Sequence, residues 1–234
     1  MIRERLQSVR ERIRDAAARA GRDPAGVHLV AVTKGHPRAA VEAALSLGLH
    51  DIGESRVQEA QAKQAGLAGG DARWHMLGHL QRNKARSAAS LFDVIHSLDS
   101  AALASALERH RLERHRVGGA EPLPVLIEVE LTGIASRSGV NAAAAADLLS
   151  GLRGLPHLSP VGLMTVAPPG PSAAVRACFA RLRDLRDRLR QSHGLSLPEL
   201  SMGMSGDFEI AVEEGATTIR LGTVLFGDLS AAGP

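Results

Sequence analysis

The chain has 234 residues, of which 44% are hydrophobic and 23% charged, and its net charge is +3. This length suits one large domain with one core and leaves little material for a second full domain. The sequence contains four Phe, one Trp and no Tyr, so a mechanism that uses a tyrosine phenol as acid, base or stacking surface is excluded.

The N-terminal residues, the lengths of the apolar runs and the cysteine count indicate the cellular compartment of the protein. The first residues, MIRERLQSVRER, are charged where a secretory signal peptide has an apolar segment. No apolar run approaches the roughly 18 residues needed to span a bilayer. The single cysteine, Cys178, allows no intramolecular disulfide and no Cys-based zinc site. We therefore expect a soluble, cytoplasmic protein with no membrane partner.

The chain begins with a predicted amphipathic helix at 2–20, which Gly21 ends. Short β-rich runs then alternate with helix-like segments. The predicted strands are 27–33, 50–54, 74–78, 92–98, 124–131, 160–166, 199–203 and 217–222. The predicted helices between them are 38–47, 55–65, 81–90, 100–116, 141–152, 172–192 and 206–214.

Several of the strand runs are almost continuously apolar, which is typical of parallel strands covered on both faces. Eight such units predict an α/β fold, a single (β/α)8 TIM-type barrel with an additional N-terminal helix. An open doubly wound sheet is the alternative, but the first strand ends AVTKGHP and lacks the G-x-G-x-x-G loop. We expect one domain over 1–234, with the helix at 1–21, the barrel at 27–228 and a short tail at 229–234.

Two Arg-rich runs, 109–116 and 181–190, raise the question of nucleic acid. Both contain Glu or Asp and lie on helix-periodic segments, so we favour a solvated helix face over a phosphate-binding surface. Without Tyr, stacking on bases has little support. We expect no nucleic-acid partner, and we expect a monomer.

Reactive groups of a barrel collect at the carboxyl ends of its strands. The first strand is followed by Lys34, one of three lysines in the chain. Because the strand is apolar, we expect the Lys34 stem to be partly desolvated, which favours a neutral amine able to attack a carbonyl. Lys34 is thus a candidate for Schiff-base chemistry, the alternative being a lysine that extends into solvent at the rim.

The last two strands are followed by the loops with which barrels most often hold a phosphate. Ser201, Ser205 and Thr223 offer hydroxyl groups there. Glycines at 203, 206 and 222 allow backbone amides to approach an anion, and a helix beginning at Ser205 or Gly206 would direct its N-terminus at it. A serine hydrolase is excluded, because GMSG is not G-x-S-x-G.

Arg220 lies within the last predicted strand, where a buried guanidinium is costly unless it meets a ligand or carboxylate. Pyridoxal 5'-phosphate would give all three features a role: a Schiff base with Lys34, phosphate at the last two loops, and the pyridine nitrogen beside Arg220. An arginine in that place would leave the nitrogen unprotonated and the ring a weak electron sink.

Other candidates are weaker. His75 and His79 are four residues apart in WHMLGH, but the motif lacks the glutamate of a metalloprotease helix. We expect no metal site and interpret both histidines as hydrogen-bonded rim or core residues. Cys178 falls on an apolar stripe and is expected to be a buried small hydrophobe.

Eight segments together resemble the pyridoxal-phosphate homeostasis protein family, the YggS/PROSC group. They are AVTK (31–34), IGESRVQE (52–59), WHMLGHLQRNK (74–84), IHSLD (95–99), SRSG (136–139), GLM (162–164), LSMGMSGDFE (200–209) and IRLGT with LFG (219–227). The resemblance covers nearly the whole chain. It implies an alanine-racemase N-terminal-like barrel without the racemase's second domain, binding pyridoxal phosphate through the lysine after the first strand.

Carried over to this chain, the resemblance makes Lys34 the Schiff-base lysine and Arg220 the partner of the ring nitrogen. It makes Ser205, Gly222 and Thr223 phosphate contacts, and Ser201 a weaker addition. The family usually has Asn at Ser55, Asn near Glu130 and Lys at Arg137. A Glu130 carboxylate facing the ring would add negative charge unless Arg137 paired with it.

Three functions follow. The first is a carrier without established catalysis that stores the cofactor and delivers it to apo-enzymes that use it. The second is an amino-acid racemase, for which Lys34 could serve one face of the substrate while the usual tyrosine is missing. The third is a Schiff-base aldolase or phosphosugar enzyme that uses Lys34 without a cofactor. The sequence favours the first.

Overall fold

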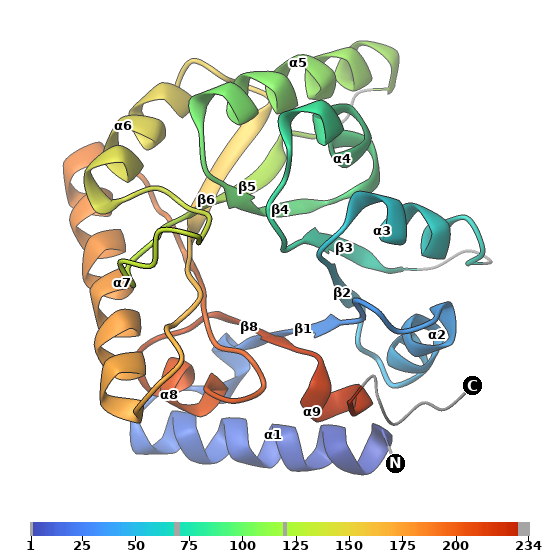
Figure 1. The fold of residues 1–234 in the computed structure, drawn as a ribbon, viewed down its shortest axis with the longest axis vertical. Helices are drawn as coiled ribbons and strands as arrows, with labels where there is room; N and C mark the ends of the chain where they lie inside the picture. The colour runs from blue at the N-terminus through green and yellow to red at the C-terminus, as the bar shows by residue number, and fades with distance from the viewer. Residues whose placement is uncertain (1, 68–70, 119–120, 229–234) are drawn as a thin grey trace.

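The computed structural model describes residues 2–67, 71–118 and 121–228. Eight parallel strands close into a barrel in their sequence order, which confirms the predicted (β/α)8 fold (Figure 1). The strands are β1 (His28–Val32), β2 (Asp51–Glu54), β3 (Arg73–Met76), β4 (Val94–Leu98), β5 (Leu123–Glu128), β6 (Leu158–Met164), β7 (Glu199–Ser201) and β8 (Thr218–Leu221).

Helices follow the strands and surround the barrel. They are α1 (Ile2–Arg19), α2 (Arg38–Ser46), α3 (Val57–Gln64), α4 (Ala85–Leu91), α5 (Ala101–Gly118), α6 (Ala142–Leu152), α7 (Ser172–His193), α8 (Phe208–Glu213) and α9 (Thr223–Phe226). The described residues also form two short 3-10 helices, η1 (Pro24–Gly26) and η2 (Arg82–Lys84). No described helix has the length and apolarity that a membrane crossing requires.

The apolar runs form strands because both of their faces are covered. All five residues of β4 are buried, and most of the core is one cluster shared by strands and helices. A smaller cluster of Val94, Leu126 and Met164 lies apart from it. Cys178 is buried on α7 as predicted, and burial raises the pKa of its thiol.

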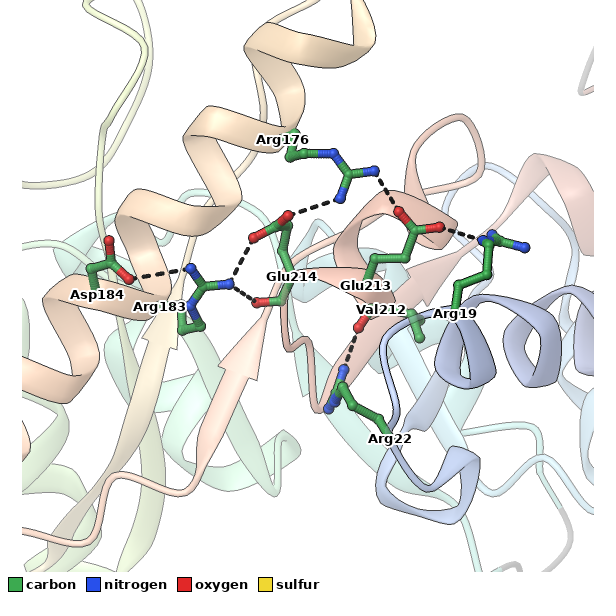
Figure 2. Close-up of polar contacts among 8 residues, drawn as sticks. All are labelled: Arg19, Arg22, Arg176, Arg183, Asp184, Val212, Glu213 and Glu214. Carbon is green, nitrogen blue, oxygen red and sulfur yellow. Dashed lines mark hydrogen bonds and ion pairs between the residues drawn. The ribbon is translucent and has the colours of Figure 1, made fainter.

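The first helix closes one side of the barrel. Its apolar stripe, spaced by three and four residues, is buried, and α1 packs beside α8 and α9 (Figure 1). Ion pairs hold this edge: Arg19 lies 2.7 Å from the Glu213 carboxylate, and Arg176 of α7 binds both Glu213 and Glu214 (Figure 2). Glu213, the last residue of α8, therefore joins the first helix to α7.

Some arginines of the two Arg-rich runs donate hydrogen bonds to backbone carbonyls of neighbouring segments. Arg111 and Arg114 on α5 donate to the carbonyl of Ala89, and Arg114 also donates to that of Ser90, near the end of α4. On α7, Arg181 donates to the Leu131 carbonyl at 2.9 Å. Cations near a helix C-terminus satisfy carbonyls that lack helical partners. Arg114 and Arg181 are nevertheless exposed, in agreement with a solvated helix face, and Arg111 is half-buried.

The structure differs from the predicted elements at several ends. The predicted helix at 206–214 begins instead at Phe208, because Asp207 accepts from the Met204 amide at 2.6 Å and closes a turn before it. The sequence did not predict η1 or α9. The expected tail at 229–234 lies outside the described residues.

Candidate functional site

Lys34 and Arg220 come from neighbouring strands. β1 and β8 pair in parallel, with Val30 opposite Arg220. The loops after both strands therefore lie at the same end of the barrel, where catalytic and binding groups of this fold collect. Gly222 allows the two loops to approach, because a Cβ there would lie 3.1 Å from the carbonyl oxygen of Val32.

A buried polar network fixes the backbone on both sides of Lys34. The Lys63 ammonium lies 2.6 Å from Glu54 Oε1 and 2.7 Å from the carbonyl oxygen of Thr33. Glu59 accepts from Lys63 and from the Gly35 amide. Lys63 and Glu54 are both buried. The residues before and after Lys34 are thus held by one ion-paired cluster, which sequence reasoning missed.

The Lys34 residue itself is exposed. The expectation that the apolar strand would desolvate its stem is therefore wrong. The physical reason is that β1 ends at Val32, so Lys34 lies in the turn that follows the strand. The Lys34 amine is accessible to a ligand at this rim.

Arg220 is buried, with only 5% of its surface exposed. Its Nη1 donates to Ser201 Oγ at 2.6 Å and its Nη2 donates to the Thr165 carbonyl at 2.8 Å. Burial lowers the pKa of the guanidinium to about 10, against the attraction of Asp207 and Glu128. A group with that pKa is still charged at neutral pH. Ser201, at the end of β7, therefore supports Arg220.

The loops after β7 and β8 contact each other. Ser205 Oγ accepts a hydrogen bond from the Val224 amide at 3.3 Å. Gly222 is the residue before α9, and Thr223 begins that helix. The first amides of a helix have no helical partner, so this corner presents N–H groups and hydroxyls together. The predicted contribution from a helix beginning at Ser205 or Gly206 is wrong, since α8 begins later.

Glu128, at the end of β5, is a site residue that the sequence did not reveal. It lines a small pocket of about 150 Å³ with Arg137 and Thr165, and its Oε2 is buried without a hydrogen-bond partner. Burial, and secondarily the charge of Asp99, raise its pKa to about 7. Its proximity to Arg220 only partly offsets this rise. A carboxyl group that changes charge near neutral pH therefore lies at the site.

Glu130 does not present a free carboxylate to the site. Its oxygens accept from the Thr132 amide at 2.6 Å, the Thr132 hydroxyl and the Gly133 amide. Partial burial tends to raise its pKa, but these hydrogen bonds lower it overall. Arg137 is not its hydrogen-bond partner, because the guanidinium donates to the carbonyls of Val166 and Ala167. Among the described contacts Arg137 thus forms no ion pair with Glu130, although its charge helps to lower the pKa of that carboxyl.

The remaining residues singled out from the sequence are placed as follows. Ser55 lies after β2, and a Cβ on Gly78 would meet its carbonyl oxygen at 2.4 Å, so the loops after β2 and β3 are in close contact. His79 pairs with Asp99 at 3.0 Å on the rim, and His75 is buried. Within the described ranges, no three His, Cys, Asp or Glu residues gather as a metal site.

The fold and site define a class. Residues 5–230 match the family model of the alanine racemase N-terminal domain, and the chain belongs to that family of barrels. An alanine racemase of Corynebacterium glutamicum shares the fold at 19% identity, with a TM-score of 0.67 over 98% of this chain and 63% of the racemase.

Nearer relatives define the family more narrowly. The pyridoxal phosphate homeostasis protein of Pseudomonas aeruginosa is 45% identical over 97% of this chain and 95% of its own length, and that of Aquifex aeolicus is 40% identical over 96% and 97%. PipY of Synechococcus elongatus, in a structure with PLP bound, is 42% identical with a TM-score of 0.84, covering 97% of this chain and 100% of PipY. The chain belongs to the pyridoxal phosphate homeostasis protein family.

Proposed function

We propose that this chain binds pyridoxal 5'-phosphate through Lys34 and acts in cytoplasmic cofactor homeostasis, as a store that delivers the cofactor without catalysis of its own. The observation that carries the proposal is that an exposed lysine, Lys34, follows β1, while a buried guanidinium, Arg220, lies on the neighbouring strand β8. Family membership and the PLP-bound PipY structure support it.

The residues present fit the cofactor chemically. When bound, the cofactor supplies an aldehyde that condenses with a lysine, a ring nitrogen and a phosphate. Lys34 provides the amine, Arg220 a donor for a ring nitrogen, and Ser205, Thr223 and the amides after Gly222 provide donors for a phosphate. Glu128 Oε2 is buried without a hydrogen-bond partner among the described residues, so the pocket leaves one polar atom free to bind a ligand.

Each group has a task that follows from its surroundings. The Lys63 network holds the backbone beside Lys34, so the amine needs only to order its own side chain. Arg220 keeps its charge and donates without giving up a proton at neutral pH. A ring nitrogen beside a permanent donor stays unprotonated, which weakens the ring as an electron sink and agrees with storage rather than turnover.

The test is chemical trapping. Purified protein mixed with pyridoxal phosphate should turn yellow, and borohydride should fix the cofactor to Lys34. Lys34→Ala should abolish the fixed adduct, while Lys84→Ala serves as the matched lysine control. Fixation on another lysine at the level of the parent chain would refute the assignment of Lys34.

Delivery needs its own experiment. The loaded protein is mixed with an apo-enzyme in the presence of a trap for free aldehyde. Activation that is faster than the trap permits would support direct transfer, whereas complete suppression by the trap would show release into solution first. The proposed partners in this transfer are apo-enzymes that use pyridoxal phosphate.

Racemisation is the second candidate, and one observation favours it. Glu128 is a carboxyl group with a pKa of about 7 at the site, and general bases work best with a pKa near the operating pH. The measurement is exchange of the Cα proton of L-alanine with deuterium in D2O. Exchange above the free-cofactor background that Glu128→Gln removes would favour the enzyme over the carrier.

A further inference from the structure

A line of polar side chains crosses the inside of the barrel from Arg220 to the opposite end. Arg220 donates to Ser201 Oγ at 2.6 Å, and Ser201 Oγ lies 2.8 Å from His96 Nδ1. His96 Nε2 lies 2.9 Å from His75 Nδ1, and His75 Nε2 lies 2.8 Å from Asp51 Oδ1. Four hydrogen bonds thus connect strands β8, β7, β4, β3 and β2.

The middle of this line is closed to water, and its far end is open. Ser201 and His96 are fully buried and His75 is 5% exposed. The Asp51 side chain is 30% exposed and forms part of the wall of a pocket of about 430 Å³ between the barrel floor and α1. The line therefore links the proposed cofactor site with solvent at the opposite face.

The two ends fix the direction of every hydrogen bond. A guanidinium can only donate, and an ionised carboxylate can only accept. Asp51 is ionised at neutral pH: burial raises the pKa of its carboxyl, but the hydrogen bond with His75 and the nearby charge of Arg73 lower that pKa overall. Since Ser201 accepts from Arg220, its one proton goes to the acceptor that the described residues offer it, His96 Nδ1.

The same logic sets the state of both rings. His96 accepts at Nδ1, so it must carry its proton at Nε2 and donate it to His75 Nδ1. His75 then carries its proton at Nε2 and donates it to Asp51. Complete burial holds the pKa of His96 well below its usual range, which keeps that ring neutral. Both histidines are thus assigned to the neutral form protonated at Nε2.

We propose that His96, His75 and Asp51 are positioning residues for Arg220, holding the Ser201 hydroxyl in the orientation that accepts from the guanidinium and so presetting the contact with the ring nitrogen. The proposal rests on the proposed function for its ligand, but the hydrogen-bond line is a property of the chain itself. Hydrogen-bond chains of this kind stabilise one orientation because reversing one member breaks its neighbours.

The first test needs no cofactor. Nitrogen-15 NMR of the histidine rings in the full chain reports which ring nitrogen carries the proton, and His75→Gln and His96→Gln assign the signals. We expect protonated Nε2 and unprotonated Nδ1 on both rings. A proton on Nδ1 of either ring would overturn the direction of the line and with it the proposal.

The second test measures cofactor retention. His96→Phe removes donor and acceptor while keeping a ring, and should raise the dissociation rate of pyridoxal phosphate about tenfold, the loss of one hydrogen bond to a charged group. His96→Gln keeps one acceptor and one donor at similar spacing and should recover most of that loss. Equal retention by His96→Phe and the parent chain, or no recovery by His96→Gln, would contradict the proposal.

A double-mutant cycle separates positioning from general damage to the fold. If His96 acts through Arg220, then His96→Phe should add nothing in the Arg220→Ala background. An unchanged tenfold effect in that background would mean a structural role and overturn the proposal. Borohydride fixation of the parent chain at Lys34 is checked first, because its absence refutes the proposed function and leaves the NMR test standing.

Asp51→Asn is a second variant that is expected to fold, since Asp51 lies at a partly exposed strand end. Asparagine can still accept from His75, so the line keeps its direction but loses its charged terminus. We expect a two- to threefold rise in the dissociation rate, roughly the effect of weakening a charge-assisted bond. Glu108→Gln is the matched control, because Glu108 binds His157 at 2.6 Å away from this line. Equal effects of the two substitutions would overturn the role of Asp51.

Discussion

The Lys63 ammonium lies 2.6 Å from Glu54 Oε1, and both side chains are buried, 7% and 0% exposed. The same ammonium holds the Thr33 carbonyl, one residue before Lys34. A buried ion pair is costly to break on one side only, because the remaining charge loses its compensation. The pair thus couples the stability of the barrel to the placement of its lysine loop.

Lys63→Met should reduce the free energy of unfolding by about 3–5 kcal/mol, since it leaves Glu54 buried without a cation. Urea unfolding followed by circular dichroism measures the loss. Arg38→Met is the control: its pair with Glu42 is 51% exposed on both sides, and such pairs contribute about 0.5 kcal/mol. Adding Glu54→Gln to Lys63→Met should restore part of the loss, and no restoration would mean that the ion pair is not the cause.

Glu128 should make stability depend on pH. Its folded pKa of about 7 lies above its ordinary value of 4.5, so the folded chain binds this proton more tightly than the unfolded chain. Its stabilising contribution is complete below about pH 4.5 and is lost as pH rises through 7. Compared with the parent chain, Glu128→Gln should gain about 2 kcal/mol between pH 5 and 8, after screening by its partial exposure.

Urea unfolding of both chains across this pH range is the measurement. Glu130→Gln provides a control whose pH profile over this range should run parallel to that of the parent chain, because the folded pKa of Glu130 is lowered from 4.5 and lies below the range. Its contribution is present above the ordinary carboxyl pKa and is lost as pH falls. Parallel pH profiles for Glu128→Gln and the parent chain would contradict the raised pKa.

Gly78→Ala should destabilise the protein by about 2 kcal/mol, since its Cβ would lie 2.4 Å from the Ser55 carbonyl oxygen and the backbone would have to shift. Gly151→Ala, on α6, meets nothing within 4 Å and should stabilise by about 0.5 kcal/mol through helix propensity. Thermal unfolding compares the two. A Gly78→Ala chain as stable as the parent would show that the loops after β2 and β3 do not touch.

Much of the fold was predictable from the sequence, because a strand that is covered on both faces consists almost entirely of apolar residues, whichever strands it pairs with. The position of Lys34 after the first strand and that of Arg220 within the last strand followed from the same pattern. Lys63, His96 and Asp51 could not be found this way, since their partners lie on other strands and meet only in the closed barrel. Glu128 was missed for a local reason. Attention fell on Glu130, but β5 ends at Glu128, and the Glu130 carboxylate accepts from the Gly133 amide in its own loop.

Arg22 and Arg176 should respond differently to salt. Arg22 donates to the carbonyls of Val212 and Ala216, and Arg22→Ala should cost about 2 kcal/mol at any salt concentration, because hydrogen bonds to backbone are little screened. Arg176 is 45% exposed and pairs with carboxylates, so Arg176→Ala should cost under about 1 kcal/mol.

At 1 M NaCl, where the Debye length is about 3 Å, the cost of Arg176→Ala should vanish. Thermal unfolding at 0.05 M and 1 M NaCl makes the comparison. If the loss of stability in Arg22→Ala also disappears in salt, then Arg22 acts through an ionic interaction rather than through hydrogen bonds to the carbonyls of Val212 and Ala216.

The pairing of β1 with β8 has a consequence for the life of a newly made chain. Lys34 leaves the ribosome early, but Arg220 and the last two loops come from the final strands, and they meet Lys34 only when the first and last strands join. An incomplete chain carries the amine without its companions. Under the proposed function, firm retention of the cofactor is therefore expected only after the first and last strands have paired.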